Sequence, residues 1–187
     1  MENKYKIFQN GSTWLRADFH LHTKEDKEFI YSENKFIQEY IESLNNQEIK
    51  VGIITNHNKF CLNEFKELRK EALKNEIYLL PGVELSVNDG SNGIHCLIVF
   101  DYEEWYKNGQ DFINQFLNAA FEGKANRESE NMRCNYNLKD LFDKLSSYRA
   151  QKRDSFVIMA HVEQTSGFLK ELDGGRIQQL SEEKVFW

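Results

Sequence analysis

The feature that most constrains the fold is an alternation of short apolar runs with longer stretches of helical periodicity. Five apolar runs have the length and composition of strands, at residues 16–22, 50–55, 77–87, 94–100 and 155–161. The helical patterns between them cover residues 32–46, 62–75, 101–121 and 136–151. Strands that alternate with helices in this order indicate an α/β protein with a mostly parallel sheet covered by helices.

The balance of charges argues against a broad basic surface. The 187 residues include 30 Asp and Glu against 24 Lys and Arg, which gives a formal net charge of −6. Autonomous binding to duplex nucleic acid is therefore disfavoured, because neutralisation of phosphates by Lys and Arg dominates that affinity.

Nothing in the sequence predicts a membrane or secretory protein. No apolar run is long enough to cross a bilayer, and the N-terminal residues lack the pattern of a signal peptide. The three cysteines, Cys61, Cys96 and Cys134, are far apart and form no C-x-x-C pattern, which favours a reducing compartment. We therefore expect a cytoplasmic protein with no membrane partner.

The five histidines all lie outside the predicted helices. His20 and His22 close the first predicted strand, where alternate residues share one face. His57 follows the second strand, and His161 closes the last one. Because active sites of parallel α/β folds gather at the carboxyl ends of strands, these four side chains point to one rim. His95 begins a strand, so it joins them only if the turn before it folds back over the rim.

Carboxylates accompany these histidines. Glu84 ends the run LLPGVE, Asp26 and Glu28 follow the first histidine pair, and Asp18 precedes it. Imidazole and carboxylate together form a ligand set for Zn²⁺, Mn²⁺ or iron. A lone H-x-H or strand-end histidine is commonly a hydrogen-bonded surface or core residue. The recurrence of these residues at successive strand junctions favours a multinuclear metal site, and no P-loop, G-x-G-x-x-G or G-x-S-x-G pattern indicates another chemistry.

The order of the motifs DFHLHT, IITNH, LLPGVE, IHCLIVF and IMAHVE resembles that of the PHP (polymerase and histidinol phosphatase) domain, over about residues 14–170. The stretches GSTWLRADFHLHT, HVEQTSGF and LDGG are most similar to PHP modules fused to a C-terminal ATPase of the SMC or AAA-like kind. Such fusions occur among bacterial anti-phage defence proteins. The resemblance implies a distorted (β/α)7 TIM-like barrel, the PHP fold, in a single domain over residues 1–187.

The chain is short for a complete barrel. Closed α/β barrels typically need about 250 residues, and the sequence ends on the apolar triplet Val185, Phe186 and Trp187. We therefore expect an N-terminal fragment of a longer, ATPase-fused protein, with the barrel incomplete in this chain.

The resemblance also implies a ligand set for two or three divalent ions, Mn²⁺, Zn²⁺ or Fe²⁺, at the C-terminal rim. The residues that match the metal-binding positions of the family are His20, His22, Asp26, His57, Glu84, His95 and His161. Asp26 best matches the extra ligand after H-x-H, with Glu28 as its competitor. The catalytic set implied is His20, His22, His57, Glu84 and His161.

Two departures from the family pattern bear on activity. Asn56 replaces the aspartate of the usual T-D-H, and we expect this loss of charge beside His57 to weaken the orientation of that ligand. The closing D-x-H of the family is missing, since the one aspartate after His161 is Asp173 and no histidine follows it. In a fragment the pair lies beyond residue 187, whereas a complete protein would lack two ligands.

These observations predict metal-dependent phosphoester hydrolysis, as a phosphatase or a nuclease, in which two ions activate a water for attack on phosphorus. The substrate would be a small phosphoester, or a nucleic acid delivered by the partner ATPase because this chain is acidic. The alternative is a degenerate PHP module that regulates or binds its partner without catalysis, as Asn56 and the missing D-x-H suggest. The oligomeric state stays open.

Overall fold

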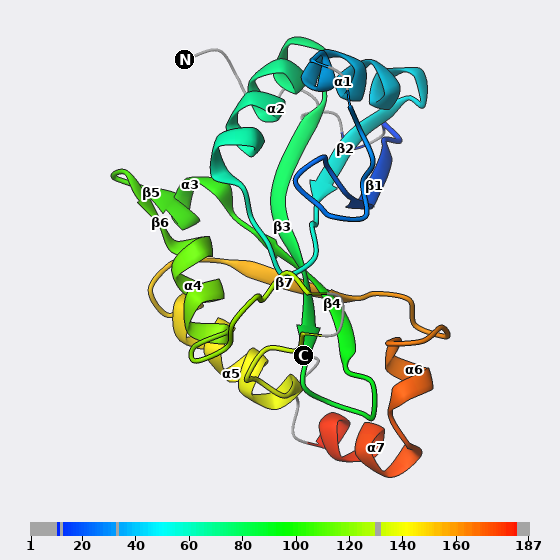
Figure 1. Ribbon diagram of the computed structural model, residues 1–187, viewed down its shortest axis with the longest axis vertical. Helices are drawn as coiled ribbons and strands as arrows, with labels where there is room; N and C mark the ends of the chain where they lie inside the picture. The colour runs from blue at the N-terminus through cyan, green and yellow to red at the C-terminus, as the bar shows by residue number, and fades with distance from the viewer. Residues whose placement is uncertain (1–10, 12, 33, 130–131, 183–187) are drawn as a thin grey trace.

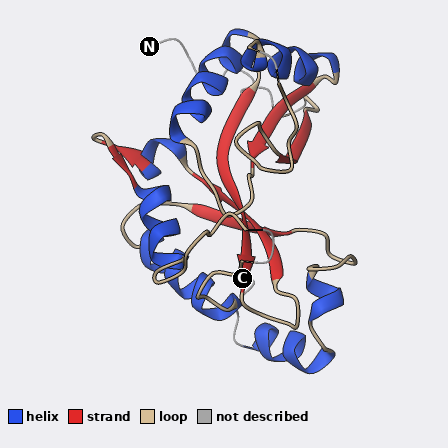
Figure 2. Cartoon of the chain, in the orientation of Figure 1, coloured by secondary structure: helices blue, strands red, loops and turns tan. Residues whose placement is uncertain are grey.

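The computed structural model describes residues 11, 13–32, 34–129 and 132–182. Residues 185–187, on which the prediction of a fragment partly rests, lie outside this part of the chain. The described residues form a curled sheet with the strand order β1-β2-β3-β4-β7 (Figure 1). Helices lie along the outside of the sheet, and the strands converge at the middle of the molecule (Figure 2).

The five strands of this sheet are β1 (Arg16–Leu21), β2 (Ile49–Ile54), β3 (Tyr78–Val87), β4 (Ile94–Phe100) and β7 (Ser155–Met159). They confirm the five predicted strands to within a few residues at each end. The sheet is parallel from β1 to β3, as predicted. β4 runs antiparallel to both β3 and β7, so the sheet is mixed and the prediction of a mostly parallel sheet holds only from β1 to β3. The connection 88–93 is too short for a crossover between parallel strands, so it can only close a hairpin.

The helices are α1 (Phe36–Asn46), α2 (Leu62–Lys74), α3 (Tyr102–Trp105), α4 (Phe112–Ala120), α5 (Leu138–Arg149), α6 (Phe168–Glu171) and α7 (Gly174–Glu182). The predicted helix over residues 101–121 is divided by a small hairpin of β5 (Tyr106–Lys107) and β6 (Gln110–Asp111). Asn108 and Gly109 in its turn have φ of 53° and 77°, which an α-helix excludes. No helix in the described ranges has the length and apolar character needed to cross a membrane.

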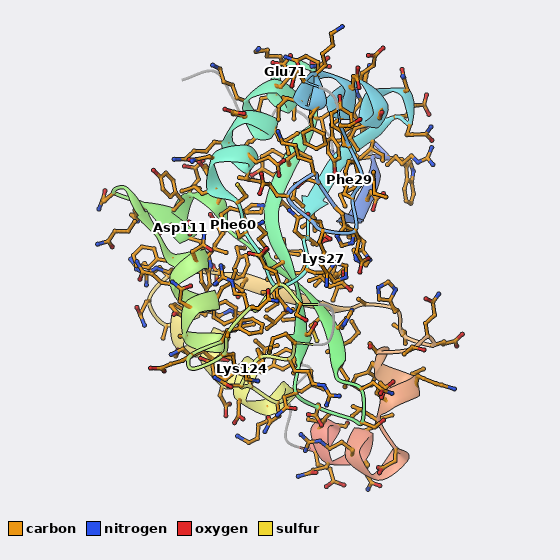
Figure 3. All side chains as sticks on the ribbon, in the orientation of Figure 1. Lys27, Phe29, Phe60, Glu71, Asp111 and Lys124 are labelled. Carbon is orange, nitrogen blue, oxygen red and sulfur yellow. The ribbon has the colours of Figure 1, made fainter. Side chains whose placement is uncertain are left out.

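The central strands are buried on both faces, as their continuous apolar runs predict. The sheet remains open between β1 and β7 among the described residues, and it gives a mixed α/β half-barrel. The full seven-unit barrel stays a prediction. Side chains fill the space between the sheet and the helices around it (Figure 3).

Gly82 lets β3 pass closely between its neighbours just before Glu84. A Cβ atom at Gly82 would lie 2.8 Å from the side chain of Ile53 and 2.9 Å from the carbonyl oxygen of Ile98. Both contacts are shorter than van der Waals packing allows, and one involves backbone that cannot rotate away. A glycine is therefore required for the strand spacing at this point.

We predict that Gly82→Ala lowers the free energy of unfolding by about 1–3 kcal/mol, the usual cost of overpacking a core. Thermal and urea unfolding of the purified protein measures the change. Gly174→Ala is the matched control, because a Cβ there meets nothing within 4 Å. An unfolding midpoint for Gly82→Ala equal to that of the control would contradict the account of the strand spacing.

Candidate metal centre

The structure brings all seven predicted ligands into one cluster. His20 lies in β1, His57 follows β2, Glu84 lies in β3 and His161 follows β7. The remaining three are His22 and Asp26, after β1, and His95 in β4. Figure 3 labels Lys27, which lies in the same loop as Asp26 and directly follows it.

His95 reaches the cluster through the direction of its strand. β4 is antiparallel to β3, so its first residues lie beside the last residues of β3, with His95 opposite Ser86. The backbone carbonyl of His95 also accepts the N–H of Ala160, 3.0 Å away, which places the end of β7 on its other side. The hairpin therefore folds the chain back after β3 and puts His95 at the rim, which is the condition that the sequence set for this residue.

The carboxylate of Glu84 lies at the centre of the cluster. Its side chain is completely buried, and its backbone is held by a bridge to His57 from the neighbouring loop. Each of its two oxygens lies close to a different set of histidines. Oε2 lies 2.7 Å from Nε2 of His20, 3.1 Å from Nε2 of His57 and 3.5 Å from Nε2 of His22. Oε1 lies 2.7 Å from Nδ1 of His95 and 3.2 Å from Nε2 of His161.

The five imidazoles form a closed circuit around this carboxylate. Adjacent ring centroids are 4.7–6.0 Å apart in the order His20, His22, His57, His95, His161 and back to His20. The last step crosses the open side of the sheet, because His20 belongs to the edge strand β1 and His161 follows the other edge strand, β7. The sheet therefore curls enough to bring its two edges together at the site.

Asp26 contacts the opposite nitrogens of two of these rings. Its buried Oδ2 lies 3.0 Å from Nδ1 of both His22 and His57, and it accepts the backbone N–H of His57 at 2.7 Å. Asp26 Oδ1 accepts the backbone N–H of Glu28, whose side chain is exposed. Of the two competing acids, the structure thus brings Asp26 to the imidazoles and leaves Glu28 outside. Asp18 accepts the backbone N–H of His20.

Both central carboxylates are held in the charged form. Burial on its own would raise the pKa of Glu84, but hydrogen bonds with His20 and His95 reverse this and hold the pKa well below its usual range. Burial likewise opposes ionisation of Asp26, and its bonds to His22 and His57 lower the pKa far more. Burial also lowers the pKa of His57, yet the bond to Asp26 and the charge of Glu84 leave it raised. A charged carboxylate is the form that a metal ion requires.

Asn56 does not act on His57 in the way the sequence suggested. Its Oδ1 accepts the backbone N–H of Thr23 at 2.8 Å, and its Nδ2 donates to Thr23 Oγ1 at 2.8 Å. The ring of His57 is oriented by Asp26 instead. The expected weakening of His57 through the Asn56 replacement was therefore wrong, because the side chain at position 56 faces the end of β1.

Sequence reasoning missed Glu171, which fixes the segment carrying His161. Its carboxylate accepts from Ser91 Oγ at 3.0 Å, from the Asn92 backbone N–H at 2.9 Å and from the Ser166 backbone N–H at 3.2 Å. These contacts join the turn between β3 and β4 to the segment after β7. No local signal marks Glu171, because its partners are backbone groups and short polar side chains, and Ser91 and Asn92 lie 80 and 79 residues away in the chain.

The donor set fits divalent metal ions. Two groups of potential ligands share Glu84: one with His20 and His161, the other with His22 and His57. In each group the ligand atoms lie within 4.8 Å of one another. Imidazole nitrogens with a carboxylate oxygen are the usual ligands of Zn²⁺, Mn²⁺ and iron. The arrangement suits a pair of ions on either side of one carboxylate.

Comparison with known proteins gives neighbours in structure alone. No protein-family model matches the sequence, and no curated protein is significantly similar to it. An amidohydrolase from Chromobacterium violaceum, solved with bound sulfate and no metal, is similar over 90% of this chain and 72% of its own, with 15% identity and a TM-score of 0.50. A protein from Bifidobacterium adolescentis assigned as a metal-dependent phosphoesterase covers 90% of this chain and 74% of its own, with 13% identity and a TM-score of 0.50. The chain shares their fold. At these identities the likeness extends no further than the fold.

We predict that Asp26→Asn weakens Zn²⁺ binding by about 10–100-fold, the usual cost of losing a carboxylate that orients ligand histidines. The amide keeps the shape but presents no charge to the two Nδ1 atoms. Competition with a chromophoric chelator measures the affinity. Glu28→Gln removes a nearby exposed charge and should leave the affinity unchanged. Equal affinities for the two variants would contradict the role assigned to Asp26.

Proposed function

We propose that this protein is a metal-dependent phosphoester hydrolase. The observation that carries the proposal is the buried carboxylate of Glu84, which is shared by two groups of potential ligands, one with His20 and His161 and the other with His22 and His57. A carboxylate between two sets of nitrogen ligands is the arrangement expected for paired ions in hydrolytic enzymes. One ion would be held by His20, His161 and Glu84, and a second by His22, His57 and Glu84, with His95 beside Glu84 Oε1.

Contacts within the protein determine which tautomer two of the proposed histidine ligands adopt. His22 and His57 each turn Nδ1 toward Asp26 and Nε2 toward Glu84. A proton on Nδ1 that is donated to Asp26 leaves Nε2 free to bind a metal ion. This pattern favours an orienting role for Asp26 over the direct ligation that the sequence resemblance implied.

Divalent ions at such a site supply Lewis acidity, which lowers the pKa of a water molecule and stabilises negative charge on phosphoryl oxygens. The exposed fractions of the imidazoles, 16–35% of each side chain, leave the cluster open to a substrate on one side. No serine or cysteine nucleophile is required, and burial raises the pKa of the Cys134 thiol to about 11 and that of Cys96 further.

Phosphoesters are the substrate class of this proposal. The neighbour from Bifidobacterium adolescentis is assigned to this chemistry, and the motif order of the sequence resembles the PHP domain. The assignment to a phosphatase or a nuclease, the ATPase partner and the defence role rest on the sequence resemblance and stay predictions. The same holds for the single domain over residues 1–187 and the cytoplasmic location.

The non-catalytic alternative loses the argument that rested on Asn56. Asn56 no longer favours a degenerate module, because its side chain faces Thr23 and leaves the orientation of His57 to Asp26. Metal content and turnover separate the two functions.

We predict that His20→Ala lowers the bound metal and reduces hydrolysis of bis-(p-nitrophenyl) phosphate or p-nitrophenyl phosphate by about 10²–10³-fold or more, as expected when transition-state stabilisation is lost. Elemental analysis of the purified protein gives the metal content, and steady-state kinetics with added Mn²⁺ or Zn²⁺ give the turnover. Glu28→Gln, with its exposed side chain, serves as the control.

Retention of full metal content and turnover by His20→Ala would show that the site is assigned to the wrong residues. Wild-type protein that binds ions but hydrolyses neither phosphomonoesters nor phosphodiesters would instead favour the non-catalytic module.

A further inference from the structure

Three buried polar side chains outside the ligand cluster form a chain of hydrogen bonds beneath it. Thr23, Asn56 and Glu64 have exposed fractions of 0%, 2% and 6%. Thr23 directly follows His22, and Asn56 directly precedes His57. Glu64 belongs to α2 and has no part in the proposed chemistry. A buried carboxyl away from the metal site needs a physical explanation, because burying a charge is costly.

The hydrogen bonds run in one direction along this chain. The backbone N–H of Thr23 donates to Asn56 Oδ1, which fixes the orientation of the amide. Asn56 Nδ2 then donates to Thr23 Oγ1 at 2.8 Å. The hydroxyl of Thr23 donates its single hydrogen to Glu64 Oε2. Each of the three contacts therefore joins a donor to an acceptor.

This chain of contacts sets the spacing of two proposed ligands. Asn56 and Thr23 join the loop after β2 to the loop after β1, beside the bond between the Thr55 N–H and the Leu21 carbonyl at 2.7 Å. The rings of His22 and His57 stack immediately beyond, with centroids 4.7 Å apart. A change in the Thr23–Asn56 contact would alter that separation.

We propose that Asn56 and Glu64 are a matched pair of positioning residues, in which a carboxyl at position 64 requires an amide at position 56. Carboxylates at both positions would present two acceptors to the one hydrogen of Thr23 and bury a second negative charge. Glu64 Oε1 has no hydrogen-bond partner among the described residues, and burial raises the pKa of Glu64 in spite of the opposing charges of Lys24 and Lys59, so a second carboxylate would lie in surroundings that already disfavour the first. The effect of the pair on ion binding rests on the proposed function, whereas its effect on stability does not.

The pairing predicts that the direction of hydrogen-bond donation from position 56 through Thr23 to position 64 can be reversed. In Asn56→Asp the Thr23 hydroxyl faces two carboxylates. Adding Glu64→Gln restores the match, since Thr23 can donate to the carboxylate at position 56 and accept from the amide at position 64. Glu64→Gln alone should have a small effect, because the oxygen of the new amide still accepts from Thr23.

The test is a double-mutant cycle with two measurements, thermal unfolding of the metal-free protein and Zn²⁺ affinity by chelator competition. We expect Asn56→Asp to lower the midpoint of unfolding by about 3–10 °C, the shift that an unmatched buried polar contact gives in a chain of this size. We expect its Zn²⁺ affinity to fall about 10-fold or more. The double variant should return to within about threefold of the wild-type affinity, the scatter of such cycles.

Asn58→Asp is the matched control. Asn58 is also a buried amide beside His57, but its partners are Ser86 and the backbone carbonyls of Arg127 and Met132. Glu64→Gln should therefore fail to rescue Asn58→Asp while it rescues Asn56→Asp.

The pairing would be overturned if Asn56→Asp unfolded at the same midpoint as the wild-type protein. It would also be overturned if the double variant were as unstable as Asn56→Asp, or if Glu64→Gln rescued Asn58→Asp equally well. If Asn56→Asp does not fold at all, recovery of folded protein in the double variant supports the proposal, and an unfolded double variant overturns it. Wild-type protein that binds no Zn²⁺ would contradict the proposed function while the unfolding cycle still decides the pairing.

Discussion

The burial of one carboxylate, that of Glu84, is the constraint on which the rest of the site depends. Removing a charge from water costs several kcal/mol unless partners compensate it. Here the compensation comes from five imidazoles carried on or just after β1, β2, β4 and β7, all within 3.5 Å of its oxygens. The curl of the sheet and the reversal at β4 both bring such partners to Glu84. The fold is thus arranged around this charge.

The strands, Glu84 and four of the clustered histidines could be predicted from local signals in the sequence, whereas the full set of seven followed from the resemblance to the PHP domain. An apolar run marks each strand, and a histidine or acid at or near the ends of β1, β2, β3 and β7 marks the rim. The direction of β4 is also encoded locally, because the short polar connection 88–93 leaves no room for a helix between β3 and β4. The break in the helix at Asn108 and Gly109 has a local signal as well, since both residue types favour positive φ.

The supporting contacts could not be predicted, because they depend on which distant residues the fold places side by side. Nothing in the neighbourhood of Asn56 shows that its amide meets Thr23, 33 residues earlier, or that Glu64 receives the hydroxyl of Thr23. Glu171 bonds to a turn 79 residues away. The replacement at Asn56 therefore looked like a loss at His57, whereas the structure shows its amide bonded to Thr23, whose hydroxyl donates to a carboxyl on α2.

Anomalous X-ray scattering from crystals grown with Zn²⁺ or Mn²⁺ tests the central claim most directly. The account predicts two adjacent peaks on either side of the Glu84 carboxylate, one near Nε2 of His20 and His161 and the other near Nε2 of His22 and His57. An absence of anomalous signal at Glu84, with the carboxylate still held by the imidazoles alone, would contradict it. So would ions bound away from this residue.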